Sequence, residues 1–222
     1  MDDLDGRTIG VIGGTGPQGR GLAYRWAVAG LPVIIGSRDA ARAESTAETL
    51  NGLRAASGIR GLANAECAAA ADLVVVAVPW EGHAATIESL RPTLTGKIVV
   101  DCVNPMGFDK QGPFALSVPE GSAAAQAAAL LPESTVVAAF HHVSAVLLAD
   151  ETIDKIDTDV LVLGDDRPAV QTVITLADRI PGIRGVYGGR LRNAAQVEAL
   201  TANLIAINRR YRAHAGIRIT DI

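Results

Sequence analysis

The chain has 222 residues, 49% of them hydrophobic, which is enough to bury the core of one α/β domain with an appended segment. Its net charge of -4 and its pI of about 5.6 argue against nucleic acid as its main partner. It contains no run of 18 apolar residues and begins with an acidic segment, so we expect a cytoplasmic protein that does not bind membranes.

The first predicted element is a buried strand at residues 9–12, and a glycine-rich turn follows it. Gly14, Gly16 and Gly19 have the spacing G-x-G-x-x-G. In such a motif the first glycine makes a tight turn, the second lets a pyrophosphate approach the backbone, and the third lets helix and strand pack closely. The phosphates then lie at a helix N-terminus. A loop that serves packing alone is the alternative, but the strand before it and the helix after it favour a dinucleotide site.

Helices and strands then alternate along the chain. The pattern predicts helices at 22–29, 40–56, 82–90, 122–131, 168–179 and 193–211, and strands at 32–35, 59–62, 73–78, 98–101, 135–139 and 159–163. Alternation of this kind produces a parallel sheet with right-handed crossovers. We therefore predict an α/β fold, a Rossmann-type doubly wound parallel sheet with a small C-terminal helical segment. Residues 102–121 are expected to form a long loop, and the tail 214–222 has no pattern of its own.

The residues after the second strand indicate which dinucleotide is bound. An NAD site usually has Asp or Glu at this position, to hold the ribose 2′-OH. Here the chain has Ser37 and Arg38, with Arg42 one helical turn further on. A hydroxyl and two guanidinium groups suit a 2′-phosphate. Asp39 could instead bind a 2′-OH, and the arginines could be solvated helix-start charges, but we predict NADP.

Cysteine and histidine usage gives no sign of a metal site. Cys67 and Cys102 form no C-x-x-C pair, and the histidines lack zinc-type spacing. Cys102 is expected to be a small buried residue, because no base stands near it in sequence. His83 and His214 are expected to lie at the surface.

Four motifs together resemble one known family. Residues 13–19, residues 36–38 with Arg42, residues 78–81 and residues 139–145 look like the corresponding parts of the F420-dependent NADP oxidoreductases. The resemblance covers nearly the whole chain, including residues 164–166 and the last helix with Glu198, Leu200 and Thr201. It implies hydride transfer between NADP(H) and the 5-deazaflavin coenzyme F420, in a protein that is typically a homodimer.

The resemblance also implies roles for particular residues. The pyrophosphate would contact Gly14, Thr15, Gly16, Pro17 and Gln18, and the 2′-phosphate would contact Ser37, Arg38 and Arg42. Trp80, Ala84 and Ala145 would border the nicotinamide, while His141, Val143, Ser144 and Ala145 would support the deazaflavin. Asn104 is a further candidate for cofactor contact, or else part of a plain turn. Trp80 could equally be ordinary packing beside Pro79.

Two departures from the family pattern concern the acceptor side. Family members can carry Thr and Pro where this chain has His142 and Ser144, and the loop at 102–119 matches poorly. The pattern at 140–145 also resembles the reductase domain of the STEAP metalloreductases, which passes electrons from NADPH to flavin. Reduction of a flavin or another acceptor is therefore an alternative function.

His141 is our candidate for a catalytic group. Hydride transfer between two rings depends on alignment more than on acid–base groups, with the reacting atoms about 3–3.5 Å apart. The accepted hydride places negative charge on the N1–C2 carbonyl edge of a deazaflavin, where backbone N–H groups or a histidine could stabilise it. Of the pair His141 and His142, one is expected to face the pocket and the other to pack or meet solvent.

Other functions are less well supported. A non-enzymatic NADPH sensor would need a protein-binding surface, and a hydroxy acid dehydrogenase would need a Lys or His base on a large helical domain.

We divide the chain into an NADP-binding Rossmann domain at 1–165 and a C-terminal helical segment at 166–222 that completes the acceptor site and the dimer contact. The apolar stripe of the helix at 193–211 favours a homodimer.

Overall fold

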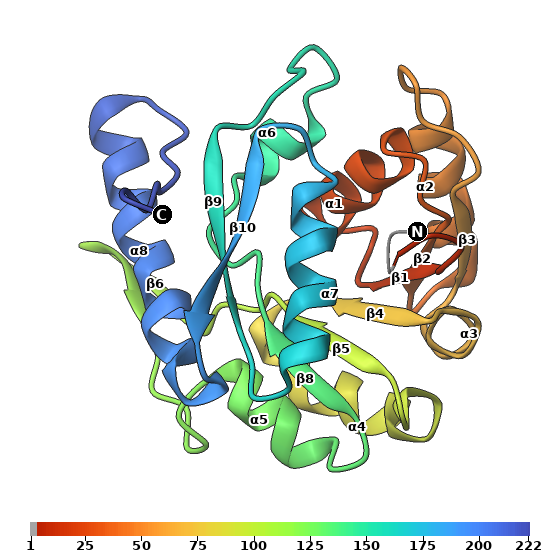
Figure 1. Ribbon diagram of the computed structural model, residues 1–222, viewed down its shortest axis with the longest axis horizontal. Helices are drawn as coiled ribbons and strands as arrows, with labels where there is room; N and C mark the ends of the chain where they lie inside the picture. Colours follow the sequence, from red (N-terminus) through yellow and green to blue (C-terminus); the bar gives the residue numbers. More distant parts are fainter. Residues whose placement is uncertain (1–3) are drawn as a thin grey trace.

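The computed structural model describes residues 4–222 and contains a central sheet of eight strands in the order β10-β9-β8-β5-β4-β1-β2-β3 (Figure 1). The strands of this sheet are β1 (Ile9–Ile12), β2 (Val33–Ser37), β3 (Arg60–Ala63), β4 (Leu73–Val76), β5 (Ile98–Asp101), β8 (Thr135–Ala138), β9 (Thr158–Leu163) and β10 (Ile183–Gly189). The helices are α1 (Pro17–Val28), α2 (Ala40–Asn51), α3 (Asn64–Ala70), α4 (His83–Leu94), α5 (Ala123–Leu130), α6 (Ala145–Ala149), α7 (Arg167–Asp178) and α8 (Ala194–Tyr211).

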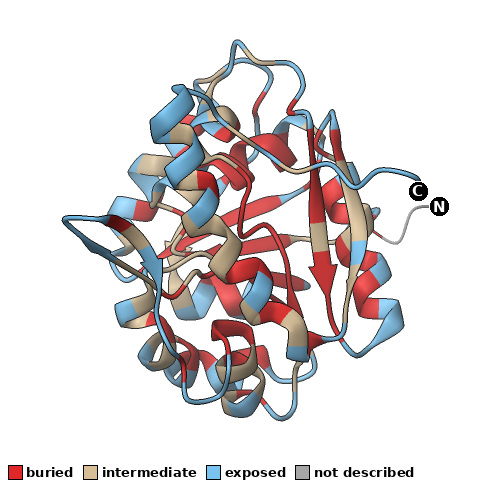
Figure 2. Cartoon of the chain, turned by 90° about the vertical axis from the view of Figure 1, so that its left-hand side faces the viewer, coloured by how far each residue is buried: buried red, intermediate tan, exposed pale blue. Residues whose placement is uncertain are grey.

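Helices cover both faces of the sheet, so the predicted doubly wound architecture is confirmed. One face packs against α1, α2, α6 and α7, through side chains such as Trp26 and Leu176. The other face packs against α3, α4, α5 and α8, through side chains such as Ile87 and Val197. Because β1, β2 and β4 are covered on both sides, every residue in them is buried, which explains their continuous apolar sequence (Figure 2).

Strand direction is parallel from β3 to β8, and the sheet becomes mixed beyond that. β1 pairs in parallel with both β2 and β4, and β5 pairs in parallel with β4 and β8. β9 then pairs with β8 in the antiparallel direction, while β10 is parallel to β9. The chain thus leaves β1 toward β2 on one side and returns to β4 on the other, which places the switch point of the sheet between β1 and β4.

Two elements are absent from the sequence prediction. The predicted loop at 102–121 contains an antiparallel hairpin, β6 (Met106–Asp109) and β7 (Gly112–Ala115), and β7 packs beside α8. The segment 166–222 contains the strand β10 as well as helices. Glycines at 185, 188 and 189 lower the strand propensity of β10, so the sequence pattern does not indicate a strand there, because glycine inside a strand weakens that strand. The Lys110–Gln111 turn is likewise not one of the dipeptides that signal a hairpin.

The C-terminal tail, for which no pattern was predicted, is held against the start of β9. The Asp159 backbone N–H donates to the carbonyl of Ile217, and the Asp159 carboxylate accepts from Arg184 and Arg218. These guanidinium groups hold the pKa of the buried Asp159 well below its usual range, with the Arg184 hydrogen bond as the main cause. The partners are separated by up to 59 positions, so only tertiary structure brings them together.

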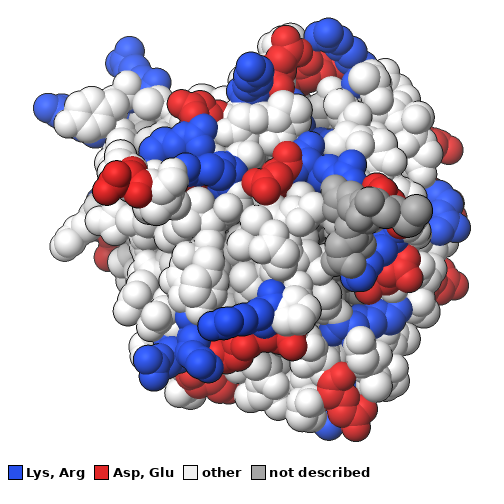
Figure 3. All heavy atoms as spheres, in the orientation of Figure 1, with Lys and Arg blue, Asp and Glu red and all other residues white. Residues whose placement is uncertain are grey.

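The charged residues are spread over the surface. On the face drawn in Figure 3, basic and acidic side chains lie among each other rather than gathering into one field of a single sign. No helix within residues 4–222 has both the length and the apolar composition that crossing a membrane requires.

Candidate functional site

A cavity of about 530 Å³ lies beside the switch point, at the carboxyl ends of β1, β2 and β4. This is where doubly wound sheets bind their ligands. The predicted cofactor residues that line it are Thr15, Gly16, Ser37, Arg38 and Arg42. Residues from the two separate motifs, the glycine turn and the end of β2, therefore meet in one cavity.

The turn after β1 has the shape that a bound phosphate needs. Gly13, rather than the predicted Gly14, makes the sharp bend: its φ is +74° and an added Cβ would lie 2.7 Å from the carbonyl oxygen of Ala77. Gly14 instead packs closely on β2, because a Cβ there would lie 2.6 Å from that of Ile35. α1 begins with Pro17 and has no side-chain cap, so its first backbone N–H groups remain available to an anion at the cavity wall.

The far end of this cavity is basic. Arg38 and Arg42 are exposed, and neither forms an ion pair within residues 4–222. Asp39, the residue that could have indicated NAD, caps α2 by accepting a hydrogen bond from the backbone N–H of Arg42 at 3.3 Å. Ser37 is buried, and its Oγ accepts from the Asp39 N–H at 3.2 Å. Two guanidinium groups without ion-pair partners in the described chain, beside an acid that is occupied in capping α2, fit a 2′-phosphate.

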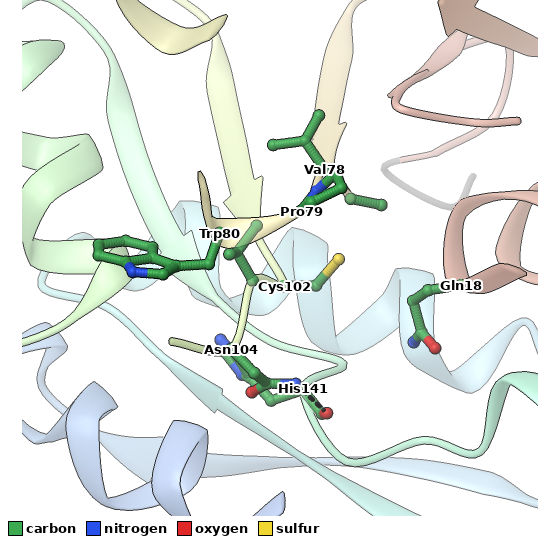
Figure 4. A pocket seen from close by; sticks show the side chains of 9 residues that line it. Gln18, Val78, Pro79, Trp80, Cys102, Asn104 and His141 are labelled. Atoms are coloured by element: carbon green, nitrogen blue, oxygen red, sulfur yellow. Dashed lines mark hydrogen bonds between the residues drawn. The ribbon is translucent and has the colours of Figure 1, made fainter. Parts of the chain in front are cut away.

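A second cavity, of about 230 Å³, continues from the first (Figure 4). The two share Ala77, Val78 and Pro79, the segment that follows β4. Gln18 from α1 and Trp80 lie on opposite sides of this second cavity, and Asn104 and His141 lie together between them. The segments that follow β4, β5 and β8 therefore meet at this cavity.

The backbone of the 140–145 loop is held in an uncommon conformation. Phe140 has a φ of +65°, which is left-handed and costs a residue other than glycine about 1–3 kcal/mol. Its buried ring packs edge-on against Trp26, with 5.5 Å between centroids. The Phe140 carbonyl accepts a hydrogen bond from Gln18 Nε2 at 3.1 Å, and the His141 carbonyl accepts from Asn104 Nδ2 at 2.8 Å and Thr201 Oγ1 at 3.1 Å.

His141 lines the second cavity, and its buried ring has no hydrogen-bond partner in the described protein. It is 4% exposed, and neither of its ring nitrogens has a hydrogen-bond partner among residues 4–222. Burial lowers the pKa of His141 to about 4, so the ring is neutral at pH 7. A neutral imidazole can donate one hydrogen bond and accept another, which suits a polar ring edge but supplies no positive charge. His142 is also buried, and burial lowers its pKa to about 4.

The prediction that His83 lies at the surface is wrong. His83 is fully buried on α4, where its Nε2 lies 2.6 Å from Asp101 Oδ2 and its Nδ1 lies 3.0 Å from Gln126 Oε1. Burial lowers the pKa of His83, but the hydrogen bond to Asp101, the Asp101 charge, the Gln126 hydrogen bond and the Glu198 charge together outweigh it, and the net shift is upward. His83 also lies under Trp80, with 5.5 Å between ring centroids. The signal in the sequence was Asp101 itself, an acid that ends an apolar strand and needs a buried partner.

Glu198 is a second buried acid near this pair. Its carboxylate accepts hydrogen bonds from the backbone N–H groups of Ala123 at 2.9 Å and Ala124 at 3.1 Å, at the start of α5. Burial raises the pKa of Glu198 to about 7, despite those hydrogen bonds. Glu198 therefore ties α8 to α5 below the second cavity.

Six predicted contact residues do not line either cavity: Gly14, Pro17, Ala84, Val143, Ser144 and Ala145. Ser144 caps α6, accepting from the Leu147 N–H at 3.5 Å, and Ala145 begins that helix. Ala84 is half-buried on α4, and Val143 is buried in the core. Within residues 4–222, no three His, Cys, Asp or Glu side chains are grouped as a metal site would need.

A phosphate-binding turn, a basic end and an adjoining pocket at the switch point define a nicotinamide dinucleotide-dependent oxidoreductase. The model of the family described as "NADP oxidoreductase coenzyme F420-dependent" matches residues 8–105. The F420-dependent NADP reductase of Methanothermobacter thermautotrophicus is 41% identical over 221 residues, which cover 96% of this chain and 95% of that protein. This chain belongs to the F420-dependent NADP reductase family.

Two other similarities bear on fold and acceptor. The crystal structure of a candidate F420-dependent NADP reductase from Arthrobacter sp. FB24 has a TM-score of 0.80 and 29% identity, covering 97% of this chain and all of that one. The rat metalloreductase STEAP3 is 30% identical over 197 residues, which cover 89% of this chain but only 37% of that protein.

We predict pKa shifts of opposite direction for two histidines of the site. Across about pH 5.5 to 8, His141 should stay neutral because it is buried without a partner, whereas His83 should titrate above its ordinary pKa because Asp101 stabilises the cation. Asp101→Asn removes that negative charge and should lower the pKa of His83. Imidazole nitrogen chemical shifts, followed by NMR against pH, measure both.

The matched control is Asp165→Asn, which neutralises an exposed acid elsewhere and should leave both histidines unchanged. Titration of His141 near neutral pH would contradict the first expectation. An unchanged His83 in Asp101→Asn would contradict the second.

Proposed function

We propose that this protein transfers a hydride between NADP(H) and the 5-deazaflavin coenzyme F420. The observation that carries the proposal is the pair of adjoining cavities that share residues 77–79: one end is basic and the other is lined by His141. The names of the relatives with 38–41% identity over 96% of the chain, F420-dependent NADP reductases, support the same pair of co-substrates.

At the nucleotide end, the protein would bind by charge and by backbone shape. The pyrophosphate would lie on the turn from Gly13 to Gln18, against the free N–H groups of α1. Arg38 and Arg42 would hold the 2′-phosphate, with Ser37 adding a hydroxyl. The dinucleotide would then extend past residues 77–79 and bring its nicotinamide to the second cavity.

At the acceptor end, the protein would align two rings and exclude water. The bound cofactors supply the hydride chemistry itself. Trp80 and the 140–145 loop would border the rings, and the neutral His141 would offer a hydrogen bond to a ring edge that becomes negative. Residues 166–222 would complete this end, because Thr201 of α8 helps to hold the His141 carbonyl.

A second candidate is the reduction of a flavin by NADPH. The similarity to the metalloreductase STEAP3, which covers 89% of this chain, favours it, because the pattern at 140–145 resembles the reductase domain of those proteins. The two candidates share the nucleotide end and differ only in the acceptor. F420 and FMN offered separately to the same preparation with NADPH distinguish them.

We predict that Arg38→Ala weakens NADPH binding about 10–100-fold, the loss expected for a hydrogen bond between charged groups, and changes NADH binding less than about twofold. Calorimetric titration with each nucleotide measures this. Arg91→Ala, which removes an exposed arginine of α4 away from the cavities, is the control and should bind both nucleotides normally. Equal losses for NADPH and NADH in Arg38→Ala would refute the 2′-phosphate assignment.

For the acceptor end, we predict that His141→Ala slows F420 reduction while NADPH affinity is unchanged. Loss of the His141 hydrogen bond to developing charge should lower the rate by about 10²–10³ if it is the main stabilising group. The rate is followed by NADPH absorbance with F420 as acceptor. A parent rate in this variant would mean that F420 is not reduced beside His141.

We also propose a homodimer formed through α8 and the β6–β7 hairpin. This region exposes Phe108 (66%), Phe114, Ile207 and Tyr211 (72%) on elements that pack beside each other. Apolar groups gathered in this way are typical of an interface between subunits.

The two free cysteines, both buried, suit the reducing cytoplasm, where we place the protein.

Sedimentation at micromolar concentration should therefore show a particle of twice 23.0 kDa. The double variant Ile207→Glu with Tyr211→Glu should shift it to the monomer, because burying two carboxylates in an apolar contact is unfavourable. Val28→Glu, which places the same charge on an exposed apolar site of α1, is the control. A parent chain that sediments as a 23.0 kDa monomer would refute the dimer.

A further inference from the structure

Gln18 is the one side chain of the nucleotide turn that contacts the 140–145 loop through a hydrogen bond described by the structure. Its residue lies in the first turn of α1, directly after Gly16 and Pro17, where backbone N–H groups have no partner inside the helix. Its side chain points away from that turn, and Nε2 donates to the carbonyl of Phe140, 122 positions further along the chain. The Gln18 side chain therefore joins the glycine turn, which borders the first cavity, to the loop that follows β8.

The acceptor of that hydrogen bond is the strained residue of the loop. Phe140 is left-handed, with a φ of +65°, and the reversal of the chain at this point follows directly on β8. Surrounding contacts must hold such a conformation in place. For Phe140 these are the packing of its ring on Trp26 and the single hydrogen bond from Gln18 to its carbonyl.

The next residue depends on the same bend. The His141 carbonyl is fixed from the other side by Asn104 and Thr201. His141 lines the second cavity, and both of its buried ring nitrogens are unpartnered among residues 4–222. If the Phe140 peptide turned, the His141 ring would leave the cavity wall. Gln18 and His141 line the same cavity (Figure 4), so the hydrogen bond from Gln18 to Phe140 joins two lining segments through the residue next to His141.

We propose that the Gln18 side chain is a positioning group that ties the 140–145 loop to the nucleotide turn. It holds Phe140 in its left-handed conformation and thereby places the His141 ring, and it makes the order of the loop depend on the occupancy of the turn. The side chain itself takes no part in binding the pyrophosphate. The part of this inference that concerns F420 rests on the proposed function.

The test uses Gln18→Met, which keeps the length of the side chain and removes its donor. We expect kcat/KM for F420 to fall about five- to tenfold, as for the loss of one hydrogen bond, while the Kd for NADPH stays within about twofold. Hydrogen–deuterium exchange of the peptide spanning 140–145 should become faster. NADP⁺ should slow that exchange in the parent protein and slow it less in the variant.

Two further variants make the result specific. Gln18→Leu also removes the donor without adding a charge near the phosphates, so it should behave like Gln18→Met, and it serves if the methionine variant does not fold. Gln171→Met makes the same substitution at an exposed position of α7 and should match the parent in every measurement. A general loss of stability would change the unfolding temperature without separating the effect on kcat/KM for F420 from the effect on the Kd for NADPH.

The outcomes separate this inference from the proposed function. Weaker NADPH binding in Gln18→Met would place the side chain on the phosphates and overturn the inference, as would unchanged exchange in residues 140–145. If NADP⁺ does not slow the exchange of residues 140–145 in the parent protein, or slows it equally in the parent and the variant, the coupling is overturned. If the parent protein does not reduce F420, the proposed function fails, and the exchange measurements still decide the role of Gln18.

Discussion

The close contact between Gly13 and Ala77 is the constraint on which the rest of the site depends. A Cβ at position 13 would lie 2.7 Å from the Ala77 carbonyl oxygen, so only glycine lets the turn after β1 lie against the segment after β4. That segment, residues 77–79, forms a wall of both cavities. The parallel pairing of β1, β4, β5 and β8 then carries three further strand ends to the same edge of the sheet. A nucleotide turn and an acceptor pocket can adjoin because these backbones approach so closely.

The polar groups below this edge have contrasting electrostatic environments. His83 has Asp101 as a charged partner, which favours its cation, whereas His141 is buried without a partner and stays neutral. The buried carboxylate of Glu198 is satisfied by the first N–H groups of α5 rather than by a cation. The position of Trp80 over His83 connects the charged pair to the wall of the second cavity. The hydrogen-bonded pair thus lies behind Trp80, while an uncharged imidazole lines the second cavity, which suits binding of planar, polar ring systems.

Local patterns in the sequence predicted residues of the first cavity more fully than residues of the second. Gly16, Ser37, Arg38 and Arg42 lie where the motif spacing predicted, since a glycine turn and the residues after the next strand are fixed by short stretches of chain. The burial of His83 could not be predicted in that way, because its partners Asp101 and Gln126 lie on other elements. The hairpin at 106–115 and the strand β10 lack turn dipeptides or regular alternation, so pairing with neighbours decides their structure.

The sequence by itself determined the alternation of buried strands and helices, the glycine turn and the basic residues after β2, because each of these depends on residues close together in the chain. Family membership likewise follows from motifs that can be read in order. Tertiary structure alone decided that Gln18 reaches Phe140, that Thr201 of the last helix holds the His141 carbonyl, and that the tail from Ile217 pairs with Asp159. These contacts join residues that are about 60 to 122 positions apart, and hydrogen bonds of that kind are selected by the packing of whole elements rather than by any local preference of the backbone.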